Sequence, residues 1–164
     1  MIEKIKALKE LKLIVKELKK KGKKIVTTNG VFDLLHRGHC EYLKKARTFG
    51  NVLIVGVNSD KSVKKIKGKG RPILNQEDRA ILLASLYFVD YVCIFDEETP
   101  NKFISVIKPD FHVKGGDYKL EDLPEKSTVE KHGGKIKIVD YIDNISTTKI
   151  IERIKNDIDN NNSI

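Results

Sequence analysis

The sequence is poor in the features that mark several classes of protein. It has no tryptophan, one methionine and only two cysteines. Cys40 and Cys93 form neither a CxxC motif nor a disulfide framework, which favours free thiols in a reducing compartment. No apolar run approaches the roughly 20 residues of a membrane-spanning helix. The opening residues, MIEKIKALKE, also lack the apolar centre of a signal peptide. We therefore expect a cytoplasmic protein that has no membrane segment.

Internal repeats and a dividing linker are absent as well. The chain has 164 residues, of which 40% are hydrophobic and 34% charged, enough for one domain with a buried core. We divide it into a basic amphipathic helix at 1–22, an α/β domain at 23–154 and a polar tail at 155–164.

The positive charge is unevenly placed. The net charge is +9, and residues 1–24 contribute +7 of it through ten lysines and three glutamates. Apolar residues recur at helical spacing in the same segment, at Ile5, Leu8, Leu11, Val15 and Leu18. We expect a helix docked on the domain with a solvated lysine face, and we do not expect nucleic acid to be the main partner. A non-catalytic module that binds a polyanion through this helix is the minor alternative.

A second basic cluster covers residues 61–71, KSVKKIKGKGR, which contain six cations and no acid. Because the cluster contains glycines and follows an expected strand, we predict a mobile loop that meets phosphates. Lys64 and Lys65 are its candidate catalytic cations.

Expected strands and helices alternate along the rest of the chain. We predict strands at 24–32, 51–58, 91–95, 111–115 and 135–142, and helices at 38–49, 75–88, 99–108 and from 146 onwards. Asn75 and Thr99 are the expected caps of two of these helices. This alternation predicts a Rossmann-like open parallel five-stranded sheet with helices on both faces. Ligands of such sheets collect beyond the carboxyl ends of the strands, where strand order reverses.

Polar residues follow the expected strands at the positions where that rule places a site. They are His36 and His39 after the first strand, Asn58 to Asp60 after the second, Phe95 and Asp96 after the third, Lys114 to Asp117 after the fourth, and Ser146 to Thr148 after the fifth.

The histidines stand in the stretch VFDLLHRGHCEYL, three residues apart. A zinc site would need a third and fourth ligand at suitable spacing, and Cys40 is adjacent to His39 in sequence. Two hydrogen-bonded histidines at a helix entrance are the structural alternative. We favour a phosphate site, because Gly38 lets an anion approach the helix N-terminus and the imidazoles supply donors. We therefore expect no metal ion bound by the protein itself.

Two further segments suit an anionic ligand. One hydroxyl of Ser146 to Thr148 should cap the last helix, which leaves the others for a second anion. The segment KGGDY, from Lys114 to Tyr118, combines a cation, two glycines and a carboxylate beside a strand end. We expect this segment to form a surface against which a base or sugar packs. Lys64, Lys65 and Arg79 are expected to bind negatively charged groups of the ligand from the opposite side.

The motifs TNGVFDLLHRGHCEYL, NSD, GRPI, EDR, VKGGDY and ISTTKII occur in this order over about 130 residues. This pattern resembles the HxGH nucleotidyltransferase superfamily of the cytidylyltransferase type. Within it, residues 23 to 154 are most similar to the adenylyltransferase domains of the bacterial ADP-heptose pathway, which serves lipopolysaccharide synthesis. The resemblance implies that ATP and D-glycero-β-D-manno-heptose 1-phosphate give ADP-heptose and pyrophosphate with Mg²⁺. It also implies a sugar kinase upstream, which we expect to be a separate chain.

The resemblance implies roles for the histidines, Gly30, Phe32, Asp33, Lys114, Asp117 and Ser146 to Thr148, and the remaining roles below are our own interpretation of the residues. Catalysis falls to His36 and His39, with Lys64 and Lys65 closing over the phosphates. Nucleotide contacts fall to Asn29, Gly30, Phe32, Asp33, Gly38, Lys114, Gly116, Asp117, Ser146, Thr147 and Thr148. Sugar phosphate contacts fall to Asn58, Asp60, Arg71 and Arg79.

Two departures count against a cytidylyltransferase. The glycerol phosphate branch has an arginine where this chain has Tyr87, and an RTxGIST stretch where it reads YIDNIST. Transfer to another acceptor, such as flavin mononucleotide, glycerol 3-phosphate or a different sugar phosphate, stays open. A homodimer is a further partner that the sequence leaves open.

Overall fold

Five parallel strands form the centre of the structure, a computed structural model that describes the chain except residues 117–118, 141–144 and 162–164. The strands are β1 (Ile25–Gly30), β2 (Val52–Asn58), β3 (Tyr91–Phe95), β4 (Phe111–Gly115) and β5 (Lys135–Val139). They form one sheet in the order β3-β2-β1-β4-β5. The predicted open parallel five-stranded sheet is confirmed.

The order of the strands places a switch point at β1. The chain builds β2 and β3 to one side of β1, and β4 and β5 to the other. Val26 of β1 lies in register with Leu53 of β2, and Thr27 with His112 of β4. All seven residues of β2 are buried, which explains why its sequence is a nearly continuous apolar run.

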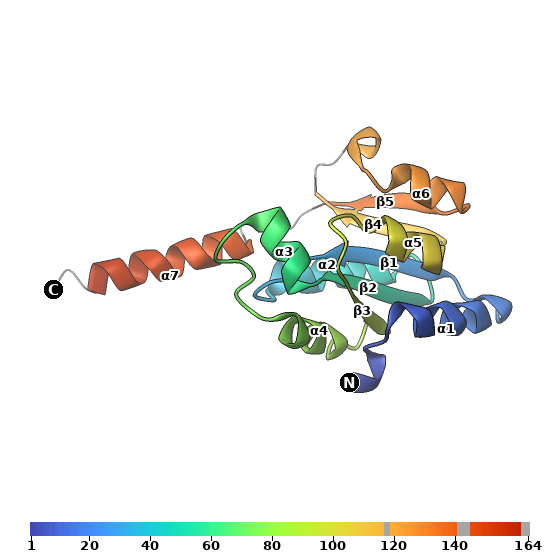
Figure 1. The fold of residues 1–164 in the computed structure, drawn as a ribbon, viewed down its shortest axis with the longest axis horizontal. Helices are drawn as coiled ribbons and strands as arrows, with labels where there is room; N and C mark the ends of the chain where they lie inside the picture. Colours follow the sequence, from blue (N-terminus) through green and yellow to red (C-terminus); the bar gives the residue numbers. More distant parts are fainter. Residues whose placement is uncertain (117–118, 141–144, 162–164) are drawn as a thin grey trace.

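Helices cover both faces of the sheet (Figure 1). On one face α2 (Arg37–Arg47) and α4 (Gln76–Ala84) pack through Leu43, Ala46, Ala80 and Leu83. On the other face lie α1 (Leu8–Lys20), α5 (Asn101–Ile107) and α6 (Lys126–Lys131). Their buried side chains there are Leu11, Val15, Phe103, Ile104, Ile107 and Val129.

The sequence predicts one continuous helix over residues 1–22, but the structure divides this segment into two helices. A short 3₁₀ helix, η1 (Ile2–Lys4), precedes α1. Between them Ile5 forms a parallel bridge with Val92 of β3, and the Lys6 N–H donates to the Val92 carbonyl over 2.9 Å. The backbone at Ile5 is therefore held by the edge of the sheet, and the helix begins only at Leu8.

The basic cluster at 61–71 is helical over most of its length, so the prediction of a loop there is wrong. Helix α3 spans Asp60–Lys67. The Ser59 hydroxyl caps it by accepting from the Ser62 N–H over 3.2 Å, and Val63 is buried beneath it. The cap and this apolar anchor outweigh the glycines, which follow only from Gly68 onwards.

The sequence predicts the N-cap residues of two other helices, and the structure confirms one of them. Asn75 caps α4 as predicted, because its side chain accepts from the Asp78 N–H over 2.8 Å. Thr99 does not cap α5, which begins at Asn101 with Pro100 at the N-cap and no side-chain cap.

The last helix, α7 (Thr147–Asn161), projects away from the sheet (Figure 1). It continues well into residues 155–164, where we expected only a polar tail. A short 3₁₀ helix, η2 (Leu120–Asp122), lies between β4 and α6. Within the described ranges, the structure contains no helix of the length and apolarity required to cross a membrane.

Candidate active site

The connection between β1 and α2 has a strained backbone. Phe32 and Leu34 adopt φ values of 50° and 49°, in the left-handed region that residues other than glycine rarely occupy. The Phe32 ring is buried and meets the His39 ring edge-on, with centroids 5.4 Å apart. Backbone strain of this kind concentrates at functional sites, where the surrounding structure holds it in place.

Asp33 fixes this connection to the segment that precedes α4. Its carboxylate accepts hydrogen bonds from the Ile73 N–H over 2.8 Å, the Leu74 N–H over 3.0 Å and Arg71 Nε over 2.8 Å. Burial acts to raise the pKa of Asp33, but these three donors outweigh it and the pKa is lowered. The carboxylate is thus an anchor of the site, and its oxygens are engaged before any nucleotide arrives.

His36 and His39 lie together at the start of α2. Their rings stack with centroids 3.8 Å apart, and the His36 N–H donates to His39 Nδ1 over 3.4 Å. His36 Nδ1 is buried and accepts or donates no hydrogen bond among the described residues. A Cβ atom at Gly38 would lie 3.1 Å from that nitrogen, so glycine leaves room for the ring at the helix entrance.

Both imidazoles favour the neutral form in the free protein. Burial lowers the pKa of His36. Burial, followed by the charge of the neighbouring His36, lowers the pKa of His39 to about 4. Because His39 Nδ1 accepts from the backbone, the proton of the neutral ring is on Nε2, where it can be donated to a ligand oxygen.

The start of α7 faces the histidines across the site. The Ser146 hydroxyl accepts from the Lys149 N–H over 3.2 Å, which confirms that a hydroxyl of this segment caps the helix. Thr147 Oγ1 donates to the Asp33 carbonyl over 2.6 Å, so this hydroxyl is not free for an anion as we expected. Thr147 instead ties α7 to the connection after β1, which leaves Thr148 as the uncommitted hydroxyl.

One cavity of about 750 Å³ joins these features at the carboxyl ends of the strands. Its volume lies in the range of small-molecule sites. Thirteen of the residues predicted from the sequence line it: Asn29, Gly30, Phe32, Asp33, His36, Gly38, His39, Asn58, Arg71, Lys114, Ser146, Thr147 and Thr148.

Five predicted residues do not line the cavity: Asp60, Lys64, Lys65, Arg79 and Gly116. The Gly116 N–H donates to the Val139 carbonyl over 3.0 Å, so this residue joins β4 to β5. Asp117 lies outside the described residues.

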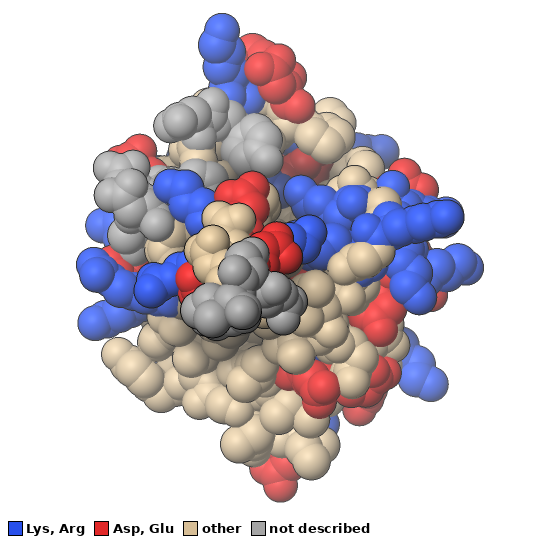
Figure 2. Space-filling model, turned by 90° about the vertical axis from the view of Figure 1, so that its left-hand side faces the viewer, with Lys and Arg blue, Asp and Glu red and all other residues tan. Residues whose placement is uncertain are grey.

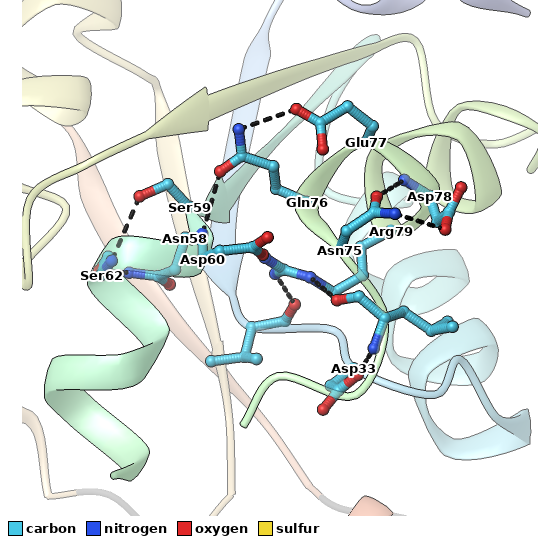
Figure 3. Close-up of polar contacts among 12 residues, drawn as sticks. Asp33, Asn58, Ser59, Asp60, Ser62, Asn75, Gln76, Glu77, Asp78 and Arg79 are labelled. Carbon is cyan, nitrogen blue, oxygen red and sulfur yellow. Dashed lines mark hydrogen bonds and ion pairs between the residues drawn. The ribbon is translucent and has the colours of Figure 1, made fainter. Parts of the chain in front are cut away.

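Arg79 is a structural residue, contrary to the prediction that it binds a sugar phosphate. Its side chain is 1% exposed, and it donates to the carbonyls of Leu74 and Val31 and to Asp60 Oδ1, the last over 2.8 Å. Figure 3 shows the guanidinium enclosed between these oxygens. Asp60 is occupied by the same ion pair, so neither side chain is presented to a ligand.

Lys67, rather than Lys64 or Lys65, is the lysine of α3 that lines the cavity. It lines the cavity together with Ile66, whereas Lys65 pairs with Glu98 over 3.4 Å. Lys67 forms no ion pair with any residue that the structure describes. Lys67 belongs to the basic cluster that the sequence indicates as a phosphate-binding segment. Choosing it over the other lysines of the cluster requires knowing that the cluster forms a helix.

The opposite end of the cavity is formed by β4 and the start of α6. Lys114 Nζ lies 2.9 Å from Glu125 Oε1 and 3.4 Å from Asn29 Oδ1. Tyr42 of α2 lies nearby and donates to the Val113 carbonyl over 2.8 Å. Sequence reasoning missed Glu125, which belongs to no motif, and Tyr42, which lies in the motif TNGVFDLLHRGHCEYL but was assigned no role; only the fold brings both to the strand ends.

Charge is unevenly distributed around this side of the molecule. Figure 2 shows Lys and Arg gathered mainly on the upper and middle parts of the face from which α7 projects, with fewer of them and several Asp and Glu side chains below. Within the described ranges, no three His, Cys, Asp or Glu side chains come together in a group that could hold a metal ion. The cavity lining includes Lys67, Arg71, Lys114 and Lys149 together with amides and hydroxyls, groups suited to phosphate oxygens.

Comparison with known proteins places this geometry in a family. The profile of the family described as cytidylyltransferase-like matches residues 27–153. The chain belongs to the cytidylyltransferase-like family. The nucleotidyltransferase superfamily that we expected from the sequence is thereby confirmed.

Other cytidylyltransferase-like proteins support the assignment at higher identity. The chain is 52% identical to Bifunctional protein HldE of Geotalea uraniireducens over 152 residues, and 52% identical to that of Nitratiruptor sp. over 151. These alignments cover 93% and 92% of this chain but only 31% and 32% of the relatives. The chain thus spans about a third of the length of these relatives.

Two solved structures share the fold. The lipopolysaccharide core biosynthesis protein of Thermoplasma volcanium matches with a TM-score of 0.62 at 34% identity, covering 76% of this chain and all of that one. Pantoate-beta-alanine ligase of Francisella tularensis gives the same TM-score at 19% identity, covering 89% of this chain and 74% of that one. The second similarity concerns the fold alone.

Proposed function

We propose that this cytidylyltransferase-like protein is an adenylyltransferase that moves AMP from ATP to a sugar 1-phosphate and releases pyrophosphate. The acceptor we propose is D-glycero-β-D-manno-heptose 1-phosphate, which gives ADP-heptose. The observation that carries the proposal is the stacked His36 and His39 pair, which lines one cavity together with the hydroxyls at the start of α7. The 52% identity to Bifunctional protein HldE and the similarity to a lipopolysaccharide core biosynthesis protein support the acceptor.

The proposed reaction is a direct displacement that needs no covalent intermediate. An oxygen of the sugar phosphate attacks the α-phosphorus of ATP, a new P–O bond forms, and the bond to the pyrophosphate oxygen breaks. Catalysis then consists of positioning the two anions and stabilising the charge that develops on the leaving oxygen. The hydrogen-bond donors among the residues that line the cavity suit that task.

The two histidines act as donors to the reacting phosphates. The backbone N–H of His36 fixes the orientation of His39, whose Nε2–H points its proton toward a phosphate oxygen. His36 Nδ1, buried and unpartnered among the described residues, offers a second position for an oxygen. Gly38 and the N-terminus of α2 add backbone donors and the positive end of the helix dipole.

The remaining cations surround the triphosphate and the acceptor. Thr148 and Lys149 at the start of α7 line the cavity, as does Lys67 of α3. Lys67 replaces Lys64 and Lys65 as our candidate for the cation that meets the reacting phosphates. Asn58, which lines the cavity near Lys67, is our candidate for the acceptor side.

Magnesium fits this site as a companion of ATP. No cluster of acidic or histidine ligands forms a metal cage among the described residues, and Mg²⁺ commonly binds through phosphate oxygens and water. When bound to ATP it neutralises charge on the phosphates. We propose that Thr148, Lys67 and Lys149 contact the remaining phosphate oxygens.

We further propose that a sugar kinase supplies the phosphorylated acceptor, because the reaction requires a sugar that already carries a phosphate at C1. A homodimer and a cytoplasmic location also remain proposals for this chain.

A screen of acceptors tests the proposed function. The protein is incubated with ATP or CTP and one of four acceptors, namely heptose 1-phosphate, glucose 1-phosphate, glycerol 3-phosphate and flavin mononucleotide, and pyrophosphate release is measured. We expect release with ATP and heptose 1-phosphate at a kcat/KM at least tenfold above every other pair. A higher value with CTP or another acceptor would reassign the substrate. No release with any pair, together with salt-sensitive polyanion binding lost on removal of residues 1–22, would favour the binding-module alternative.

A further inference from the structure

A chain of polar side chains is buried beneath one end of the cavity. It starts at Thr27 of β1, passes through His112 of β4 and Glu125 at the start of α6, and ends at Lys114 of β4. Thr27 Oγ1 lies 2.8 Å from His112 Nδ1, His112 Nε2 lies 3.6 Å from Glu125 Oε1, and Lys114 Nζ lies 2.9 Å from the same oxygen. Two side chains of β4, His112 and Lys114, thus approach one carboxylate at the start of α6, and Thr27 of β1 contacts the first of them.

Burial makes this arrangement costly for the fold. His112 is 0% and Glu125 1% exposed, and a buried carboxylate loses much of its hydration. Replacing a whole buried ion pair with apolar side chains of similar volume is often neutral or favourable for stability. The burial of His112 in β4 and of Glu125 at the start of α6 therefore calls for a reason other than stability.

The buried polar side chains determine one another's charge states. Burial would raise the pKa of Glu125, but His112 and Lys114 outweigh this effect and lower its pKa to about 2. Burial lowers the pKa of His112, and the Glu125 carboxylate opposes that shift without cancelling it. A neutral His112 thus lies beside an ionised Glu125, and the Thr27 hydroxyl donates to His112 Nδ1.

The carboxylate fixes the position of a cation at the cavity wall. Lys114 lies between Glu125 Oε1 and Asn29 Oδ1, and all three residues line the cavity. Lys114 and Asn29 stand on β4 and β1, on either side of the switch point. A flexible lysine held there by a buried acid keeps its amine where a substrate anion arrives, which reduces the ordering cost of binding.

We infer that Glu125 and, behind it, His112 are positioning residues that hold the Lys114 amine for a phosphate group of a bound substrate. This inference rests on the proposed function, and it adds two residues that touch no substrate. The phosphate belongs either to ATP or to the sugar 1-phosphate, and the two sources are separated by measuring each substrate in turn.

A double-mutant cycle tests the role of Glu125. Glu125→Gln, Lys114→Ala and the double variant are compared with the wild type for the KM of each substrate and for kcat. We expect Glu125→Gln to raise one KM about tenfold, in line with coupling between contacting residues. The same change should have no further effect once Lys114 is alanine. An equal Glu125→Gln effect in both backgrounds, or no effect in either, would overturn the inference.

The test needs controls for folding. Glu130→Gln removes an exposed acid from the same helix, and we expect its KM values and melting temperature to match the wild type. A Glu125→Gln variant whose melting temperature falls while both KM values stay at the wild-type level would show a structural role only and would contradict the inference.

His112 is tested by two changes of different severity. His112→Leu removes the ring, and Thr27→Val removes only the hydroxyl that orients it. We expect both to raise the same KM as Glu125→Gln does, by a smaller factor. If His112→Leu does not fold, the KM values of Thr27→Val test the role of His112 instead. Unchanged KM values of Thr27→Val would remove His112 from the proposal.

Binding without turnover separates this inference from the proposed function. Isothermal titration with Mg·ATP alone and with heptose 1-phosphate alone is done on the wild type and on Glu125→Gln. A wild type that forms no product contradicts the proposed function, while weaker binding of either phosphate by Glu125→Gln still supports the positioning role. Equal binding of both ligands by the two proteins would overturn that role.

Discussion

The rings of His36 and His39 stack at an interplanar angle of 22°, with centroids 3.8 Å apart, and the backbone N–H of the first donates to Nδ1 of the second. The contact sets the orientation and tautomer of His39, so that its Nε2–H is available at the cavity. The backbone of His36 thus positions the ring of His39, and the absence of a Cβ atom at Gly38 leaves room for the His36 ring beside it.

Replacing His39 with alanine should lower turnover far more than stability. The variant loses a donor to the reacting phosphates, and we expect kcat to fall on the order of 100-fold, as for the loss of other transition-state donors. Steady-state rates and thermal melts on the same preparations check this. A kcat within twofold of the wild type would exclude the histidine from the chemistry.

The fold should lose stability as the pH falls from about 6.5 toward 4. The pKa of His39 is lowered to about 4 in the folded state, while the unfolded chain takes up the proton near 6.5. The unfolded state therefore binds more protons in this window, and acid favours it. Urea unfolding at several pH values should give a steeper loss for the wild type than for His39→Asn, which cannot titrate there. Equal slopes for the two proteins would contradict the assignment.

Gly38→Ala should impair activity with little effect on stability. The added Cβ would lie 3.1 Å from the His36 ring and from Ile145 Cγ2, so the ring must shift by a few tenths of an ångström. Alanine is otherwise favourable in a helix. We expect a loss of kcat/KM with a melting temperature close to that of the wild type. Full activity would mean that the place of the His36 ring is not critical.

Alanine variants of the lysines of α3 test whether Lys67, or instead Lys64 or Lys65, contacts the reacting phosphates. Lys67→Ala should raise KM on the order of tenfold, because a charge-assisted hydrogen bond contributes about 1.5–3 kcal/mol. Lys64→Ala and Lys65→Ala should have smaller effects, since neither residue lines the cavity. Kinetics of the three variants under identical conditions decide the matter. The reverse order of effects would require α3 to rearrange when substrate binds.

Arg79→Ala should destabilise the fold. The change leaves Asp60 without its partner and two carbonyls without a donor, and breaking such a buried pair costs on the order of 3 kcal/mol. The free energy of unfolding in urea measures this loss. A variant of wild-type stability with a raised KM for the sugar phosphate would restore the sequence-based role of Arg79.

The sheet was predictable because parallel strands buried on both faces have a distinctive sequence. The apolar run of β2 and the polar residues at the strand ends together indicate an open α/β fold, and the motif around His36 and His39 then locates the site. Residues 61–71 show where prediction of secondary structure from composition fails. Their lysines and glycines suit a loop, and only the Ser59 cap and the burial of Val63 make them a helix.

Assignments of single side chains failed where tertiary partners decide. Arg79 and Asp60 read as ligands of an anion, but they bind each other in the folded chain. Thr147 stands in a row of three hydroxyls, and nothing local indicates that it bonds to the Asp33 carbonyl 114 residues earlier. Glu125 could not be found at all, since its significance depends on Lys114 and His112, which belong to another element.

The fate of labelled phosphorus in ATP tests the central claim most directly. The protein is incubated with heptose 1-phosphate, magnesium and ATP that carries ³²P at either the α or the γ position, and the products are separated by chromatography. Adenylyl transfer predicts that the α label appears in a nucleotide sugar with the mass of ADP-heptose and the γ label in pyrophosphate. A γ label on the sugar, or an α label that stays in ATP while His36 and His39 are intact, would contradict the account.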